Sequence, residues 1–248
     1  MKNTRKNTRK NTSKNAEIST EKNISVALAQ IKQRISAAER RFNRKPNSVQ
    51  LLAVSKTKPI TAIQIAIEAG QCCFAENYLQ EAAEKIMYFK NPQLIWHFIG
   101  SIQSNKTRDI AQLFQWAHTI DRIKIARRLN EQRPDHLPPL NICLQINISG
   151  ENSKSGIAPD ELIQLADDCS SLANIKIRGL MAMPAQDSDF ERQRIPFREL
   201  KRLFTELQST HPELDTLSMG TTNDLEAAIA EGATIVRIGT AIFGSRNY

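Results

Sequence analysis

A single lysine stands where a run of apolar residues ends. The run Leu51–Val54 has the unbroken hydrophobicity of a strand that is buried on both faces, and Pro59 ends the segment after it. Lys56 lies between the two. A lysine at such a point can sit in a dry pocket, where desolvation disfavours the ammonium and leaves an amine able to attack a carbonyl carbon. The pattern therefore predicts a Schiff-base lysine; the alternative is a solvated charge at a strand end.

Two segments near the carboxyl end, residues 218–224 and 237–244, combine glycines with hydroxyl side chains. Glycines allow backbone N–H groups to approach an anion, hydroxyls add donors, and Thr222 or Asn223 can cap a helix whose N-terminus favours phosphate. These segments predict a phosphate site, and the alternative is a pair of ordinary tight turns.

A Schiff-base lysine that faces a phosphate site implies a ligand with an aldehyde at one end and a phosphate at the other. Pyridoxal 5′-phosphate has that shape. Arg237 precedes the second glycine segment and could reach the pyridine nitrogen of this cofactor. Because a guanidinium stays protonated and has no acceptor, it would keep that nitrogen unprotonated and make the ring a weak electron sink. The alternative for Arg237 is a salt-bridged residue of the sheet.

These residues need elements that bring them together, and short apolar runs recur along the chain. The runs are Leu51–Val54, Cys72–Ala75, Ile95–Ile99, Trp116–Ile120, Ile142–Ile148, Ile177–Met183, Thr216–Met219 and Thr234–Ile238. All but the last precede a longer stretch of helical period. Eight strands alternating with helices predict a single α/β domain, a closed (β/α)8 TIM barrel, in which the site lies at the carboxyl ends of the strands.

The N-terminal segment differs in composition from the rest. Residues 1–15 hold six cations and no anion, so that six of the eight net positive charges lie there and the remaining residues carry +2. We predict a disordered basic tail over residues 1–22 and a barrel domain over 23–248, whose first helix has Ile24, Leu28, Ile31 and Ile35 on one face. The barrel gives no reason to expect nucleic acid, although the tail could bind anionic surfaces.

We find no sequence pattern typical of a signal peptide, a membrane span or a metal site. The tail has no apolar core of a signal peptide, and no run approaches the ~18 apolar residues of a membrane span, so we expect a soluble cytoplasmic protein without a membrane partner. The four cysteines show neither a C-x-x-C pair nor metal-like spacing with the histidines. We expect reduced thiols and no metal.

Long motifs in this sequence resemble one family. They are LLAVSKTKP, FAENYLQE, WHFIGSIQSNKTR, INISGENSKSGI, RGLMAM and SMGTTNDLEAAIAEGATIVRIGTAIFG. From about Ile24 to Arg246 the chain is similar to the pyridoxal 5′-phosphate homeostasis proteins (YggS/PROSC type), which have the alanine-racemase N-terminal barrel fold. In this chain Thr221-Thr222 stand where Met-Ser is more usual in the family. Thr222 keeps a hydroxyl, but the substitution alters the geometry expected around the phosphate.

The resemblance assigns roles to individual residues. Lys56 is implied as the aldimine lysine and Arg237 as the partner of the pyridine nitrogen. The implied phosphate site consists of Ser218, Gly220, Thr222, Gly239 and Thr240. Asn77, His97, Asn105 and Met181 fall in motifs that line the same opening, and the alternative for His97 is a hydrogen-bonded residue of the barrel interior.

The resemblance also implies a function. It is non-catalytic binding of pyridoxal 5′-phosphate and its delivery to cofactor-dependent apo-enzymes, which keeps the free aldehyde low and affects amino- and keto-acid balance. One alternative is an amino-acid racemase on the same barrel. Such racemases add a C-terminal β domain with a tyrosine as second base, whereas this chain ends at Tyr248 directly after the eighth run, so we expect a monomeric carrier. A class I aldolase using Lys56 leaves Arg237 unexplained.

Overall fold

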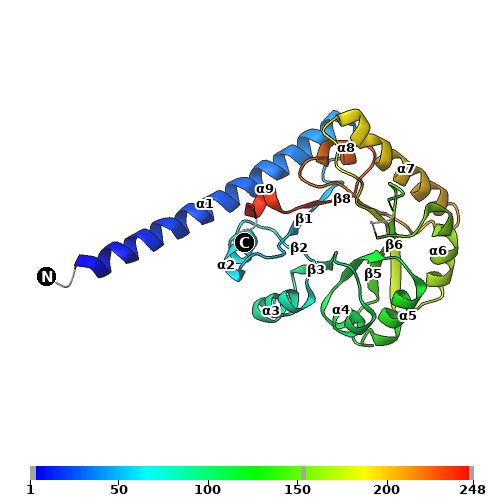
Figure 1. The fold of residues 1–248 in the computed structure, drawn as a ribbon, viewed down its shortest axis with the longest axis horizontal. Helices are drawn as coiled ribbons and strands as arrows, with labels where there is room; N and C mark the ends of the chain where they lie inside the picture. Colours follow the sequence, from blue (N-terminus) through cyan, green and yellow to red (C-terminus); the bar gives the residue numbers. More distant parts are fainter. Residues whose placement is uncertain (1–3, 152–154, 246–248) are drawn as a thin grey trace.

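The computed structural model describes the backbone of residues 4–151 and 155–245 and the side chains of residues 23–151 and 155–245. Strands and helices alternate along the chain, and the strands form a closed barrel that the helices surround (Figure 1). The predicted α/β fold, a (β/α)8 TIM barrel, is therefore confirmed.

The barrel strands agree with the apolar runs to within two residues at every end. They are β1 (Gln50–Val54), β2 (Cys73–Glu76), β3 (Ile95–Phe98), β4 (Trp116–Ile120), β5 (Leu140–Ile146), β6 (Ile175–Ala182), β7 (Thr216–Ser218) and β8 (Ile235–Ile238). Each pairs in parallel with the next, and β1 pairs with β8, where Leu52 lies opposite Arg237. This last pairing closes the barrel and sets the first strand beside the last.

Both faces of the strands are buried, which explains why their sequences lack a polar alternation. Leu52, Val54, Cys73, Ala75 and Ile235 form a small cluster on the inner face. A larger cluster fills the layer between the outer face and the helices. Because successive side chains of a strand point to opposite faces, neighbouring residues of one strand serve these two clusters in turn.

Helices follow the strands around the barrel. They are α2 (Ile60–Glu68), α3 (Leu79–Phe89), α4 (Thr107–Leu113), α5 (Ile123–Gln132), α6 (Leu162–Ser170), α7 (Phe190–Gln208), α8 (Leu225–Ala230) and α9 (Thr240–Phe243), with 3-10 turns η1 (Ser104–Lys106) and η2 (Pro159–Glu161). Within the described part of the chain, no helix has both the length and the apolar character that crossing a membrane requires.

The first helix, α1 (Thr4–Arg41), precedes β1 and ends beside α8 and α9 (Figure 1). Ile24, Leu28, Ile31 and Ile35 are at most 5% exposed, which confirms the predicted apolar face. The helical backbone begins at Thr4, whereas the sequence predicts a tail through residue 22. Residues 1–3 and the side chains before residue 23 lie outside the described part, so the basic tail and its boundary stay predictions.

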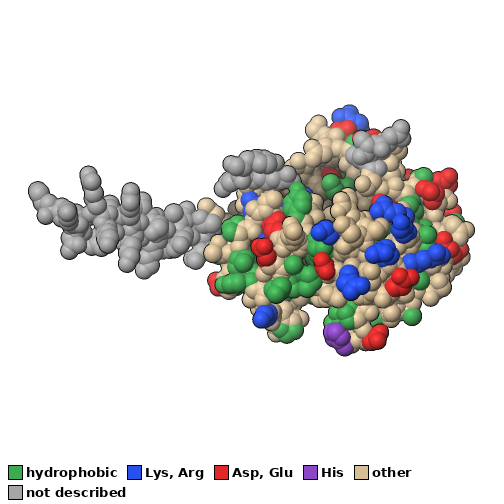
Figure 2. Space-filling view, turned by 60° about the horizontal axis from the view of Figure 1, so that its bottom comes forward, with side chains coloured by type: hydrophobic (Ala, Val, Ile, Leu, Met, Phe, Trp, Pro, Cys, Tyr) green, Lys and Arg blue, Asp and Glu red, His purple; other side chains and the backbone are tan. Residues whose placement is uncertain are grey.

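The charged side chains of the barrel are mixed over the face shown in Figure 2. Lys and Arg side chains lie there among Asp and Glu side chains. Charged side chains of the described residues form ion pairs within and between helices, as Arg202 does with Glu199 and Glu206 on α7. Exposed pairs of this kind contribute little to stability.

Candidate cofactor site

The predicted cofactor residues lie in, or shortly after, four strands that are neighbours in the closed barrel, in the order β7, β8, β1 and β2. Lys56 comes after β1 and Asn77 directly after β2, while Thr222 and Thr240 belong to the segments after β7 and β8. The carboxyl ends of parallel strands lie at one end of a barrel. The structure therefore gathers these residues along one arc of that rim, called the mouth below.

Lys56 occupies the second position of a tight turn, Ser55–Lys58. The Lys58 N–H donates to the Ser55 carbonyl oxygen over 3.1 Å, and Thr57 has a φ of +62°. A positive φ at the third position of a β-turn is normally adopted by glycine or asparagine, and a β-branched residue is strained there. Lys56 itself is partly buried. Such strain persists only where surrounding contacts impose it, and it is concentrated at functional sites.

Arg237 lies inside the barrel and is 4% exposed. Its Nη1 donates to Ser218 Oγ over 2.8 Å, and its Nη2 donates to the carbonyl oxygen of Ala182 over 2.9 Å. Burial lowers the pKa of Arg237 to about 10, with Asp224 acting in the opposite direction. The guanidinium is therefore still protonated at neutral pH and is fixed in place from β6 and β7.

Two fully buried histidines extend this arrangement across the barrel. His118 Nδ1 lies 2.8 Å from Ser218 Oγ, and His118 Nε2 lies 2.8 Å from His97 Nδ1. Burial lowers the pKa of His97 to about 3. Burial, followed by the neighbouring charges of His97 and Arg237, holds the pKa of His118 well below its ordinary value. Both rings are therefore neutral at pH 7, and Arg237 carries the charge of this group.

The Ser218 hydroxyl, which the resemblance implies as part of the phosphate site, is hydrogen-bonded within the protein. It is bonded to Arg237 and His118 inside the barrel, and the residue is fully buried. Met181 lies opposite Ser218 in the β6–β7 register and is also buried. Among these described contacts, Ser218 is a support for Arg237. The phosphate assignment of Ser218 and of the other predicted residues stays a prediction.

Close packing requires two of the predicted glycines. Gly220 has a φ of +94°, and a Cβ there would lie 2.6 Å from the Cβ of Ala228 on α8. A Cβ on Gly239 would lie 3.2 Å from the carbonyl oxygen of Val54. A side chain at either position would push away α8 or the end of β1. The two segments thus lie close against the elements that frame the mouth.

The threonines of these segments have different surroundings. The Thr221 N–H and hydroxyl both donate to Asp224 Oδ1, over 2.5 and 2.8 Å. Thr222 is partly buried, and its carbonyl oxygen accepts from Arg34 of α1 over 3.2 Å. Thr240 is exposed at the first position of α9. Thr222 and Thr240 therefore lie where their hydroxyls can be offered to a ligand.

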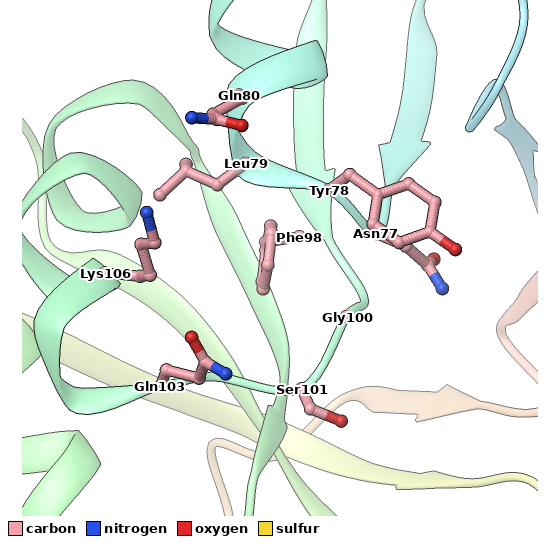
Figure 3. Close-up of a pocket in the computed structure, with 9 residues that line it drawn as sticks. All are labelled: Asn77, Tyr78, Leu79, Gln80, Phe98, Gly100, Ser101, Gln103 and Lys106. Atoms are coloured by element: carbon pink, nitrogen blue, oxygen red, sulfur yellow. The ribbon is translucent and has the colours of Figure 1, made fainter.

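A pocket of about 430 Å³ opens beside the mouth, between the segments that follow β2 and β3. Figure 3 shows Asn77 and Tyr78 on one side of it, Lys106 on the other, and Phe98 between them. Asn77 Oδ1 is buried and has no hydrogen-bond partner among the described residues. Gly100 touches the Asn77 backbone so closely that a Cβ would lie 2.2 Å from its carbonyl oxygen. Asn105 is exposed on η1.

The structure also shows polar groups near the mouth that sequence reasoning did not assign. His118 interrupts an apolar strand, a signal that could have identified it as a second interior histidine. Glu76 ends β2 and forms a buried ion pair with Lys85 on α3, with 2.7 Å between Oε1 and Nζ. Lys85 has no such signal, because a lysine in an amphipathic helix usually faces water.

Comparison with known proteins gives close relatives over most of the chain. Residues 26–247 match the family described as alanine racemase, N-terminal domain. The pyridoxal phosphate homeostasis protein of Escherichia coli K12 is 54% identical over 229 residues, which cover 91% of this chain and 98% of that protein. The structure of PipY from Synechococcus elongatus with PLP bound has a TM-score of 0.77 at 35% identity, over 89% of this chain and 100% of that chain.

A more distant comparison concerns the fold alone. Alanine racemase from Clostridium difficile has a TM-score of 0.73 at 13% identity, over 90% of this chain and 57% of that chain. The barrel is thus common to a catalytic protein and to the proteins named for homeostasis.

Proposed function

The chain belongs to the pyridoxal phosphate homeostasis protein family, and we propose that it binds pyridoxal 5′-phosphate at the mouth of its barrel and delivers it without catalysing a reaction. The single observation that carries this proposal is Arg237, a buried cation held by Ser218 and Ala182 beneath the mouth. A guanidinium has donors only, which suits an unprotonated pyridine nitrogen.

The other residues at the mouth fit the two remaining ends of the cofactor. Leu52 lies opposite Arg237 in the β1–β8 register, and Lys56 follows the end of β1, so the amine and the guanidinium come from neighbouring strands. Thr222 and Thr240 lie on the neighbouring side with the close-packed glycines 220 and 239, and they can offer hydroxyl and backbone donors to a phosphate. Asn77 Oδ1 is a buried acceptor without a hydrogen-bond partner among the described residues, and a ligand could donate to it.

Lys56 would form the covalent attachment. Pyridoxal 5′-phosphate supplies an aldehyde, to which a primary amine adds with loss of water. The Lys56 Nζ is the amine, the carbonyl oxygen leaves as water, and a carbon–nitrogen double bond remains. The bond is reversible by water or by another amine, which is what delivery of the cofactor requires.

The same geometry supports a carrier over an enzyme. Arg237 would leave the pyridine nitrogen unprotonated, so that the ring would stabilise a carbanion poorly. A carrier that holds the aldehyde as a reversible linkage would keep its free concentration low and influence the balance of amino and keto acids. We further propose that the protein is a cytoplasmic monomer that hands the cofactor to apo-enzymes.

Absorption spectroscopy tests the attachment. The protein incubated with pyridoxal 5′-phosphate should be yellow, and borohydride should bleach the band and fix the cofactor on Lys56, as peptide mass spectrometry would show. Lys56→Ala should lose the band and bind at least about tenfold more weakly, a difference of about 1.4 kcal/mol. Lys58→Ala is the matched control, since the Lys58 ammonium bonds to the carbonyl oxygens of Gly244 and Ser245. A colourless wild type would contradict the proposal.

Turnover assays test the absence of catalysis. We expect no racemisation, transamination or decarboxylation of common amino acids above the rate of the free cofactor. Racemisation of alanine or serine at about one turnover per second, an ordinary enzymatic rate, would contradict the carrier function.

A further inference from the structure

A buried ion pair lies behind the turn that carries Lys56, on the outer face of the barrel. Glu76 is fully buried at the end of β2, and Lys85 on α3 is 3% exposed. Lys85 Nζ lies 2.7 Å from Glu76 Oε1 and also contacts Glu81. Burial raises the pKa of Glu76, while the charge and hydrogen bond of Lys85 act against this rise. Two charges have thus been taken out of water at a point where the sheet meets the helices.

This pair bonds to two of the three polar groups of Ser55, the residue before Lys56. The Ser55 hydroxyl donates to Glu76 Oε1 over 2.6 Å, and the Ser55 carbonyl oxygen accepts from Lys85 Nζ over 2.8 Å. The Ser55 N–H donates to the Ala75 carbonyl oxygen over 3.0 Å, which continues the β1–β2 ladder. The peptide group that joins Ser55 to Lys56 is therefore fixed from β2 and α3 together.

The same carbonyl oxygen closes the strained turn. It accepts from the Lys58 N–H as well as from Lys85, and the residue between Lys56 and Lys58 is Thr57 with its φ of +62°. A threonine avoids this conformation unless neighbouring contacts impose it. The contacts of Ser55 with Glu76 and Lys85 bear directly on the first residue of this turn.

Stability alone does not account for such a pair. Removing two ions from water costs more than their attraction returns unless the geometry is excellent, and apolar replacements of buried pairs are often neutral or stabilising. What this pair achieves is a defined position for one peptide group. An amine must be held near its reactive geometry, and a displacement of about 1 Å can reduce a rate a hundredfold.

We propose that Lys85, paired with Glu76, is a positioning residue that holds the Ser55–Lys58 turn in its strained form and thereby aims Lys56 into the mouth. The assignment rests on the proposed attachment of the cofactor to Lys56. Lys85 does not touch the ligand; it acts through Ser55. Its loss should therefore impair the covalent step and leave non-covalent binding intact.

The test compares two probes in variants that keep the buried charge balanced. Glu76→Gln with Lys85→Met removes both charges together, which protects the fold. Pyridoxal 5′-phosphate reports attachment through the visible band, and 4′-deoxypyridoxine phosphate, which has no aldehyde, reports the rest of the site. We expect the rate of attachment to fall about tenfold to a hundredfold, with the affinity for the deoxy analogue unchanged.

A second substitution separates positioning from general damage. Thr57→Gly accepts a positive φ without strain. Added to the double variant, it should bring the rate of attachment back toward that of wild type. Arg178→Met is the matched control, because Arg178 pairs with Asp215 near the opposite ends of β6 and β7, and it should leave both probes unaffected.

Each result has a distinct meaning. Attachment at the wild-type rate in the double variant overturns the positioning assignment, and so does an equal loss of affinity for both probes or a failure of Thr57→Gly to restore the rate. A wild type that never attaches the cofactor contradicts the proposed function instead.

Discussion

At the scale of single residues, Arg237 is supported through Ser218 by two uncharged histidines, His118 and His97. Ser218 Oγ accepts a hydrogen bond from Arg237 Nη1 and is also hydrogen-bonded to His118 Nδ1. His118 is hydrogen-bonded in turn to His97. Because burial keeps both imidazoles uncharged near pH 7, they support Ser218 without placing a second positive charge beside Arg237. A protonated histidine at the same place would repel the guanidinium.

Removal of the Ser218 hydroxyl should reveal how much this support contributes. Ser218→Ala leaves Arg237 Nη1 and His118 Nδ1 without their partner, and a hydrogen bond to a charged group is worth roughly 1.5–3 kcal/mol. We expect the free energy of unfolding in urea to fall by about that amount and the affinity for pyridoxal 5′-phosphate to decrease. Ser209→Ala, at an exposed helix end, is the control; equal stability of the two variants would contradict this account.

The buried histidines also predict a loss of stability in acid. The pKa of His97 falls from 6.5 when unfolded to about 3 when folded. Below pH 6.5 the unfolded chain binds a proton that the native protein does not, so the stability present above pH 6.5 is lost as the pH falls toward 3. The loss between pH 7 and 5 that His97 causes is about 2 kcal/mol.

Urea unfolding at the two pH values measures this dependence. His97→Gln lacks one of the titrating groups, so its loss between pH 7 and 5 should be smaller than that of wild type by about 2 kcal/mol. Identical slopes for the two proteins would show that His97 takes up its proton in the native state.

At the scale of elements, α1 supports the segment after β7 from outside the barrel. Arg34 bonds to both carboxylate oxygens of Glu226 on α8, over 3.0 and 2.9 Å, and to the Thr222 carbonyl oxygen. Arg44 bonds to the carbonyl oxygens of Ile229 and Ala233 over 2.9 Å each. Helix α1 and the segment after it, in which Arg44 lies, thus hold the β7–α8 unit, which carries Thr222 of the proposed phosphate site.

Arg34→Ala should weaken binding through the phosphate alone. The side chains of Arg34 and Glu226 are about one-third exposed, so we expect a modest effect, an increase of about two- to fivefold in the Kd for pyridoxal 5′-phosphate. The Kd for pyridoxal, which lacks the phosphate, should not change. Fluorescence titration measures both, with Arg202→Ala on α7 as the control. A parallel change for the two ligands would contradict the link to the phosphate segment.

The strands could be predicted from the sequence because each is buried on both faces and reads as an apolar run, and Lys56 stood out because it closely follows one of them. The hydrogen bonds inside the barrel could not be predicted. His118 and Ser218 are 100 residues apart, and their contact depends on where the barrel closes. Alternation along β7 turns the Ser218 side chain inward, but its bonds to Arg237 and His118 depend on strands that are distant in the sequence. Lys85 looks like any solvent-facing helix lysine.

At the scale of the whole molecule, charge and packing are distributed differently along the chain. Residues 1–15 carry six of the eight net positive charges, whereas the described buried residues of α1 begin at Ile24. The pairing of β8 with β1 closes the barrel and brings residues from both ends of its sequence to the mouth. The basic segment and the cofactor site should therefore be energetically separate.

Truncation from the N-terminus tests that separation. Deletion of residues 1–15 should leave the thermal midpoint and the affinity for pyridoxal 5′-phosphate unchanged, because the deleted segment has no apolar period. Any affinity for nucleic acid or anionic vesicles should fall and be screened by salt. Deletion through residue 31 is the contrasting variant: it removes Ile24, Leu28 and Ile31 from the core and should lower the midpoint by many degrees. If the shorter deletion also lost cofactor or melted several degrees lower, the first fifteen residues would have to pack on the barrel, and the boundary at residue 22 would be wrong.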